Sequence, residues 1–95
     1  MEKNITFRHC NGHHPDLNDL AIDTLTKFEK YNDRIINGEI IFNNEKYKEV
    51  EIRLNIKDTT LFASEKSDEF KKSLALASNK MQRQVKKHKS KIISN

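Results

Sequence analysis

The stretch EVEIRLNIK, from Glu49 to Lys57, alternates apolar and polar residues without a break. Its apolar positions are Val50, Ile52, Leu54 and Ile56. Because successive side chains of a β-strand point to opposite faces of a sheet, this period of two predicts a strand with one face in the core and the other in water. A sheet with a single apolar face needs a cover, so we expect the rest of the chain to supply helices for that face.

Three further strands are predicted around this one. Gly38 to Asn43 is rich in Ile and Phe, and the turn NNEK separates it from the alternating stretch. Thr59 to Ser64 follows after the short turn Lys57-Asp58. Strands joined by such short turns form an antiparallel meander. Asn4 to His9 also alternates, which predicts a first strand at the start of the chain.

Two segments have apolar residues at the three- and four-residue steps of an amphipathic helix. The first runs from Pro15 to about Asn32, and Pro15 suits the first helical position because its missing N–H would be unpaired there. Its predicted apolar face consists of Leu17, Leu20, Ala21, Leu25, Phe28 and Tyr31. We expect Asn37-Gly38 to stop whatever precedes it.

The second helix is predicted from Phe70 to Ile92. Ser67 is its expected N-cap, with Asp68 and Glu69 in the first turn. Its apolar positions are Phe70, Leu74, Ala77, Met81, Val85 and Ile92. The sequence therefore predicts an α+β fold of order β-α-β-β-β-α, in which both helices pack on one face of a four-stranded sheet and leave the other face open.

The length of 95 residues predicts a single domain, residues 1–95. No apolar run approaches the roughly 18 residues that cross a bilayer, and the first residues lack the apolar core of a signal peptide. We therefore expect a soluble, cytoplasmic protein with no membrane association. Cys10 is the single cysteine, so an internal disulfide is excluded, which agrees with a reducing compartment.

The formal net charge of +4 conceals a strong asymmetry along the chain. The first seventy residues carry ten basic and fourteen acidic side chains, whereas the last 25 carry eight basic side chains and no Asp or Glu. Charge divided in this way indicates a polyanionic partner for the C-terminal helix.

Five cations of this helix are predicted to share a solvent-facing arc roughly 100° wide, at about 100° per residue. They are Lys72, Lys80, Arg83, Lys87 and Lys91. The alternative is a solvated face whose lysines complement the helix dipole, but such faces interleave acids and none follows Glu69. The pattern favours phosphate binding. In the first helix, Lys27 and Lys30 either extend this surface or complement that helix's own dipole, and the sequence leaves both readings open.

The open sheet face is predicted to be a poor surface for RNA. RNA-recognition sheets stack bases on exposed aromatic residues, but the central strand presents Glu49, Glu51 and Arg53 there, and carboxylates repel phosphate. We expect RNA to meet the helices or an edge instead. The phenylalanines are expected mostly in the core, and they are Phe7, Phe28, Phe42, Phe62 and Phe70.

Metal binding and catalysis find little support. The side chains with metal-ligand chemistry lie within six residues, too close together for a tetrahedral site, so a polar loop is favoured and no metal or cofactor is predicted. They are His9, Cys10, His13 and His14. His88 lies on the apolar side of its helix and is expected to pack there. The chain has no Gly-rich phosphate loop, nucleophile elbow or zinc-protease spacing, so we expect no enzyme. A small acylphosphatase-like hydrolase remains an alternative, although CNGHHPD is a poor version of the anion loop it needs.

Four segments together resemble the short ribosome hibernation-promoting factors, also called ribosome-associated translation inhibitors or protein Y. They are YNDRIINGEIIF, VEIRLNI, TTLFASEKSDEF and MQRQVKKHKSKI. The resemblance extends from about Asn4 to Ile92 in matching element order. Since the chain ends at Asn95, we expect the short form, without the C-terminal dimerisation domain of the long form.

The resemblance implies a partner and a role. It implies binding to rRNA of the small ribosomal subunit, in the channel for messenger RNA and transfer RNA anticodon arms, and inhibition of translation in stationary phase or stress. It implies a monomer off the ribosome and leaves other hibernation factors open as partners. The second-helix residues that match the family's rRNA contacts are Lys80, Arg83, Lys86, Lys87, Lys89 and Lys91. Lys27 and Lys30 match in a first helix that departs from the family by being rich in Asp. A general double-stranded RNA-binding module is the alternative.

Overall fold

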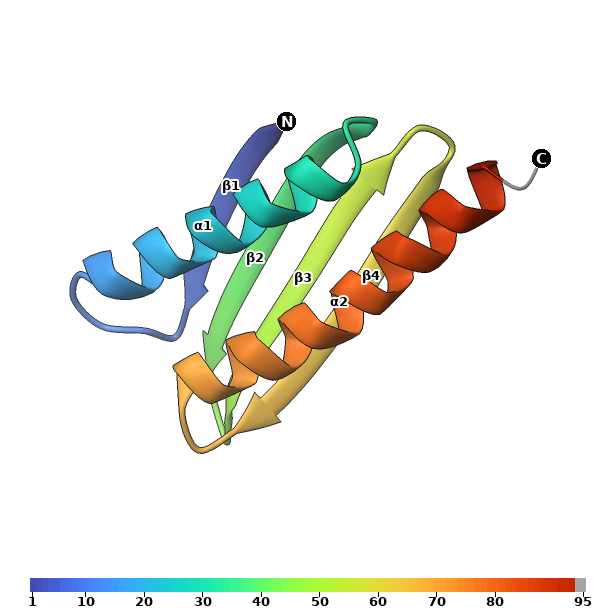
Figure 1. The fold of residues 1–95 in the computed structure, drawn as a ribbon. Helices are drawn as coiled ribbons and strands as arrows, with labels where there is room; N and C mark the ends of the chain where they lie inside the picture. Colours follow the sequence, from blue (N-terminus) through green and yellow to red (C-terminus); the bar gives the residue numbers. More distant parts are fainter. Residues whose placement is uncertain (94–95) are drawn as a thin grey trace.

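The computed structural model describes the backbone of residues 1–93 and the side chains of residues 1–88. Within this part of the chain the elements are β1 (Glu2–Arg8), α1 (Pro15–Tyr31), β2 (Ile35–Asn44), β3 (Lys48–Ile56), β4 (Thr59–Ser67) and α2 (Phe70–Ile93). The strands form one sheet in the order β1-β2-β3-β4 (Figure 1). The β1-β2 pair is parallel and the other two pairs are antiparallel. The predicted α+β fold and its β-α-β-β-β-α order are confirmed.

The alternation in β3 divides the sheet into two faces. Val50, Ile52, Leu54 and Ile56 are at most 3% exposed, whereas the residues between them reach solvent. The register continues this division across the sheet, because Ile52 lies opposite Ile40 on β2 and Ala63 on β4. A buried aliphatic side chain of this size contributes about 1.5–3 kcal/mol.

Both helices cover this apolar face and run in the same direction (Figure 1). α1 buries Ala21, Leu25 and Phe28 against the sheet. The buried apolar residues of α2 are among those that the helical spacing predicted, namely Leu74, Ala77, Met81 and Val85. The opposite face of the sheet is open, as expected from the sequence. No helix in the described residues is long and apolar enough to span a bilayer.

The prediction that Asn37-Gly38 would stop the preceding element is wrong, because β2 begins at Ile35 and passes through both residues. A Cβ atom at Gly38 would lie 2.9 Å from Leu25 Cδ2 and 3.0 Å from Leu54 Cδ2. The glycine therefore permits a close approach of α1 and β3 to β2, and it does not make a turn.

The start of α2 also differs from the prediction. Ser67 is the last residue of β4, and the helix begins at Phe70, so Asp68 and Glu69 precede its first turn. The Ser67 hydroxyl still accepts the Glu69 backbone N–H at 3.2 Å, and the buried Ser73 adds a second polar link, because its Oγ donates a hydrogen bond to the Lys48 carbonyl and lies 2.7 Å from Ser67 Oγ. This link fixes the first turn of α2 to the ends of β3 and β4.

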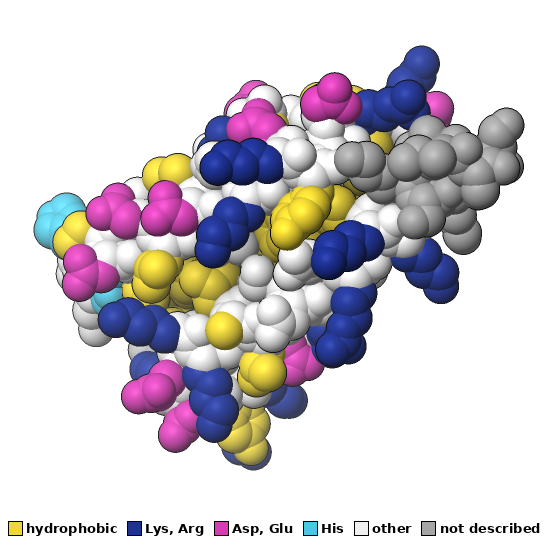
Figure 2. Space-filling view, viewed as in Figure 1, with side chains coloured by type: hydrophobic (Ala, Val, Ile, Leu, Met, Phe, Trp, Pro, Cys, Tyr) yellow, Lys and Arg dark blue, Asp and Glu magenta, His cyan; other side chains and the backbone are white. Residues whose placement is uncertain are grey.

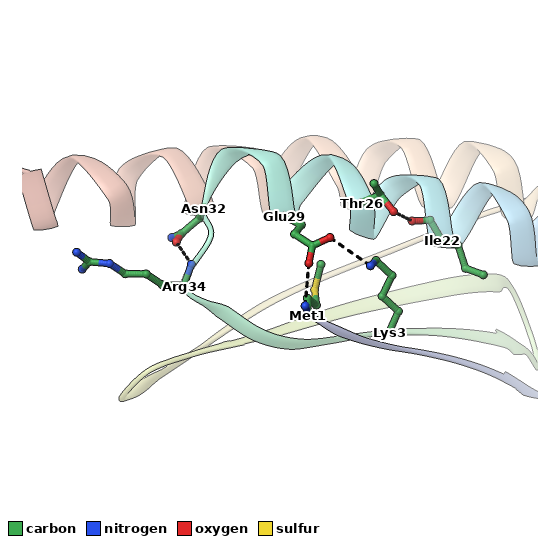
Figure 3. A network of polar contacts seen from close by, with 7 residues as sticks. All are labelled: Met1, Lys3, Ile22, Thr26, Glu29, Asn32 and Arg34. Atoms are coloured by element: carbon green, nitrogen blue, oxygen red, sulfur yellow. Dashed lines mark hydrogen bonds and ion pairs between the residues drawn. The ribbon is translucent and has the colours of Figure 1, made fainter.

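Polar contacts also hold the C-terminal half of α1 (Figure 3). Glu29 Oε2 accepts a hydrogen bond from the amino group of Met1 at 2.8 Å, and Glu29 Oε1 accepts one from Lys3 Nζ at 3.2 Å. Beyond the helix, Asn32 Oδ1 accepts the Arg34 backbone N–H at 2.9 Å. These bonds attach α1 to β1 and start the turn into β2.

Candidate nucleic-acid interface

The parallel course of the helices brings their C-terminal halves to the same end of the molecule. At the opposite end, the first turns of both helices line a shared hollow that includes Pro15 and Phe70. α1 carries Asp16, Asp19 and Asp23 in its first half and its two lysines in its second half. The arrangement therefore sorts charge along the helix layer, and Figure 2 shows magenta side chains over the N-terminal half of α1 and dark blue ones around the C-terminal halves of both helices.

We call the group of cations at this end the basic end. All five are exposed, and none forms an ion pair with another side chain among residues 1–88. They are Lys27 and Lys30 from α1 and Arg83, Lys86 and Lys87 from α2. Neighbouring helices lie about 8–10 Å apart, so one phosphate backbone can reach cations from both. The structure thus brings the two lysines of α1 close to the cations of α2. This holds whether Lys27 and Lys30 bind phosphate or only complement the dipole of α1.

Two other cations of the predicted site have acidic partners. Lys80 Nζ lies 2.7 Å from Glu65 Oε1 on β4, and Lys72 Nζ lies 3.9 Å from Asp68. Lys72 also lies eleven residues before Arg83, about 16 Å along the helix axis. The structure therefore separates Lys72 from the basic end and partly neutralises Lys80, and their RNA contacts stay predictions.

Lys89 and Lys91 complete the predicted set. Both belong to α2, which continues to Ile93, but their side chains lie outside the described residues. Their RNA contacts also stay predictions.

Tyr31 was expected on the apolar face of the first helix, and this expectation is wrong. The side chain is 40% exposed, because Tyr31 is the last residue of α1 and its neighbour Asn32 already leaves the helix with extended backbone. Its hydroxyl accepts a hydrogen bond from Gln82 Nε2 at 3.0 Å, and Lys86 Nζ lies 5.7 Å from the ring centroid. The exposure of Tyr31 could have been predicted from the sequence, because tyrosine is amphipathic, lies in the last turn of the helix and directly follows Lys30.

The open face of the sheet combines acidic groups with one aromatic residue. The register places Glu39, Arg53 and Phe62 side by side, with Glu49 and Glu51 farther along β3. Phe62 was expected in the core but is 47% exposed, because its neighbour Leu61 takes the position that faces the helices. The Arg53 guanidinium carbon lies 5.6 Å from the Phe62 ring centroid. The three carboxylates share this face with cations, because the register also places Arg8 beside Asn43 and Lys66 beside Glu49, so the face is close to neutral and is not free of aromatic surface.

The histidine loop directs its side chains to different places. His9 Nε2 lies 3.2 Å from Glu45, the His14 ring stacks on Phe7 with centroids 5.1 Å apart, and Cys10 Sγ lies 3.2 Å from the Arg8 carbonyl oxygen. No three His, Cys, Asp or Glu side chains gather to hold a metal ion in the part of the chain that the structure describes.

A small α+β domain that presents exposed cations on the adjacent ends of two parallel helices has the charge distribution that a polyanion-binding domain requires. The family model described as "Sigma 54 modulation protein / S30EA ribosomal protein" matches residues 4–93, and the chain belongs to this family. The resemblance to ribosome hibernation-promoting factors is thereby confirmed, and two relatives of that name add to it.

The "Ribosome hibernation promoting factor" of Pseudomonas putida is 30% identical over 92 residues, which are 96% of this chain and 89% of that protein. The "Ribosome hibernation promotion factor" of Bacillus subtilis is 29% identical over 82 residues, which are 82% of this chain and 43% of that protein. The chain thus spans less than half the length of the Bacillus relative.

Two solved structures have the same fold. A ribosomal subunit interface protein from Coxiella burnetii superposes with a TM-score of 0.85 at 27% identity, covering 95% of this chain and 99% of that one. The N-terminal domain of Thermus thermophilus Protein Y superposes with a TM-score of 0.81 at 15% identity, covering 93% and 99% respectively, and at that identity it supports the fold alone.

Proposed function

We propose that this protein is a ribosome hibernation factor that binds rRNA of the small ribosomal subunit in the decoding and transfer RNA channel. In this proposal it inhibits translation stoichiometrically, without catalysis, in stationary phase or stress. Family membership supports the ribosome-associated hibernation role, and the names of the relatives agree with it. Its site of action is the cytoplasm, where ribosomes work, and off the ribosome it is a monomer.

The observation that carries the rRNA contact is the basic end, five exposed cations from two helices. Arrayed Lys and Arg side chains gain affinity by neutralising phosphates and releasing counterions. The sheet holds the two helices rigidly, because the buried residues of α1 and α2 pack against the same apolar face. The helices grip the phosphate backbone, and the volume of the domain blocks the channel.

The test is charge reversal at the basic end. Arg83 and Lys87 are exposed, so the double variant Arg83→Glu and Lys87→Glu is expected to fold and to lose binding to vacant small subunits in a sedimentation assay. The control variant, Lys46→Glu and Lys66→Glu, makes the same change in net charge in the β2-β3 turn and at the adjoining end of β4, and it is expected to sediment with the subunits. Equal binding by both double variants would refute this surface.

A general double-stranded RNA-binding role is the second candidate. It is favoured by the fact that lysine and arginine contacts to phosphate carry no sequence information in themselves. Competition separates the two roles, since a ribosome-specific factor stays bound to small subunits in excess duplex RNA. The hydrolase alternative predicts turnover of phosphoester or acyl phosphate substrates, which a substrate panel tests directly.

A further inference from the structure

Tyr31 lies where the two cationic helix ends meet, and its environment differs from that of a core tyrosine. Two-fifths of the side chain is exposed, and the hydroxyl is held by Gln82 from the other helix at 3.0 Å. Exposed cations flank it, with Lys30 next to it in sequence, Lys27 one turn earlier, and Lys86 Nζ at 5.7 Å from the ring. A fixed aromatic ring inside a cationic surface offers a flat apolar contact to an anionic ligand.

The second tyrosine of the chain provides an internal comparison. Tyr47 is 48% exposed and also has two lysines at its ring, Lys46 at 5.8 Å and Lys66 at 5.2 Å. It lies in the β2-β3 turn, separated from the Tyr31 end by the ten residues of β2, about 30 Å. Glu45 and Glu49 line the same hollow as Tyr47, so the charge around it is balanced. Of the two tyrosines, Tyr31 is the one whose ring is exposed beside cations without acidic ion-pair partners among residues 1–88.

We propose that Tyr31 stacks an unpaired nucleobase of single-stranded RNA at the basic end, while the neighbouring cations hold the phosphates on either side of that base. The proposal rests on the function proposed above and specifies its ligand as unstacked, not duplex, RNA. Base stacking on aromatic side chains is the usual means by which proteins bind unpaired RNA, and it tolerates any base because every base has a π face. A base inside a duplex offers no free face to the ring.

The groups around the ring have separate tasks in this arrangement. Gln82 links the helices through its hydrogen bond to the Tyr31 hydroxyl and makes a minor contribution to the position of the ring. The long flexible stem of Lys86 allows its ammonium group to leave the ring and reach a phosphate when a base takes its place. Arg83 lies one helical turn before Lys86 and meets the next phosphate.

The first experiment measures tyrosine fluorescence, which is direct because the chain has two tyrosines and no tryptophan. Tyr47→Phe leaves Tyr31 as the single emitter, and Tyr31→Phe leaves Tyr47. Each variant is titrated with a single-stranded oligoadenylate and with an abasic ribose-phosphate strand of equal length. We expect saturable quenching of Tyr31 by the oligoadenylate only, with Tyr47 reporting the absorbance of the RNA. Equal quenching of both tyrosines, or none of Tyr31, overturns the proposal.

The second experiment measures affinity for vacant small subunits and for the oligoadenylate. Tyr31→Leu is expected to weaken binding about five- to 150-fold, the range for loss of one stacked base. Tyr31→Phe keeps the ring, so its affinity should lie within about twofold of that of the parent protein. Tyr47→Leu should have the affinity of the parent protein. Gln82→Ala removes the same inter-helix hydrogen bond but keeps the ring, so it should lose less than Tyr31→Leu.

The outcomes separate this inference from the proposed function. If Tyr31→Leu binds subunits like the parent while reversal of Arg83 and Lys87 abolishes binding, the stacking role is wrong and the ribosome role stands. If Gln82→Ala or Tyr31→Phe loses as much as Tyr31→Leu, the residue only links the helices and the proposal fails. If the parent chain does not bind subunits but oligoadenylate quenches Tyr31, the ribosome role fails and a single-stranded RNA site remains.

Discussion

Glu29 is the residue whose charge state most directly links α1 to β1. The hydrogen bond from the Met1 amino group, followed by that from Lys3, lowers the pKa of Glu29 below its ordinary value of 4.5 (Figure 3). A carboxyl group whose pKa is lower in the folded than in the unfolded chain stabilises the fold above the unfolded pKa. That contribution disappears as the pH falls through the folded pKa.

We therefore expect Glu29→Gln to lower the melting temperature at pH 7 and to have a smaller effect at pH 3. The measurement is a pair of thermal melts for parent and variant at each pH. Glu45→Gln is the control, because Glu45 is exposed and pairs only with His9 among the described side chains. A Glu29→Gln effect of equal size at both pH values would show that the ion pairs do not contribute.

At the scale of elements, the contact between α2 and β4 decides whether Lys80 can take part in RNA binding. Lys80 and Glu65 are 2.7 Å apart, and their side chains are 52% and 25% exposed. An ion pair this exposed contributes at most about 1 kcal/mol, so its removal leaves the fold intact. The ion pair partly neutralises Lys80, so this cation of α2 is less available to a phosphate.

Glu65→Gln is accordingly expected to increase affinity for RNA, because it releases Lys80. The dependence of log K on log salt should steepen by about 0.7 to 0.9 if the released cation gains one phosphate. Glu45→Gln removes the same charge in the β2-β3 turn, where Glu45 pairs with His9 and not with a cation of α2, and it should leave the slope unchanged. A Glu65→Gln slope equal to that of the parent would remove Lys80 from the predicted site.

The elements themselves were largely predictable, since periodicity reports which face of a strand or helix is buried. The alternation from Val50 to Ile56 and the spacing of Leu74, Ala77 and Met81 fixed the apolar faces without knowledge of their neighbours. The environments of single positions inside these elements were not predictable in the same way. Gly38 is set by the approach of Leu25, and Phe62 is exposed because the strand register and its neighbour Leu61 assign the buried position.

The interface was predictable in part for the same reason. The cations of α2 were evident from composition, but the pairing of Lys80 with Glu65 depends on a strand distant in sequence. The Tyr31 hydroxyl is bonded to Gln82, 51 residues away, and no local pattern connects the two residues. Local patterns predict surfaces, whereas long-range contacts decide which members of a surface are free to bind.

At the scale of the whole molecule, the fold converts the uneven distribution of charge along the chain into a molecule with a basic end. Both helices end at the same side, so the cations of two separate segments lie together (Figure 2), while Glu39, Glu49 and Glu51 lie on the opposite, open face of the sheet. We expect a polyanion to approach this molecule through the basic end, where the cations have no acidic partners among the described side chains. The charge distribution is then expected to orient the protein before any close contact forms.

This orientation predicts a definite response of ribosome binding to salt. Five cations that each neutralise one phosphate give a slope of log K against log salt of about −3.5 to −4.5, depending on whether the RNA is single- or double-stranded. The variant Arg83→Glu and Lys87→Glu removes two of these contacts, so any residual binding should respond less steeply, by about 1.4 to 1.8 in slope. Measurement of small-subunit affinity at several salt concentrations gives both values. A flat response for the parent protein would mean that phosphate neutralisation does not drive binding, because the release of counterions makes affinity fall as salt rises.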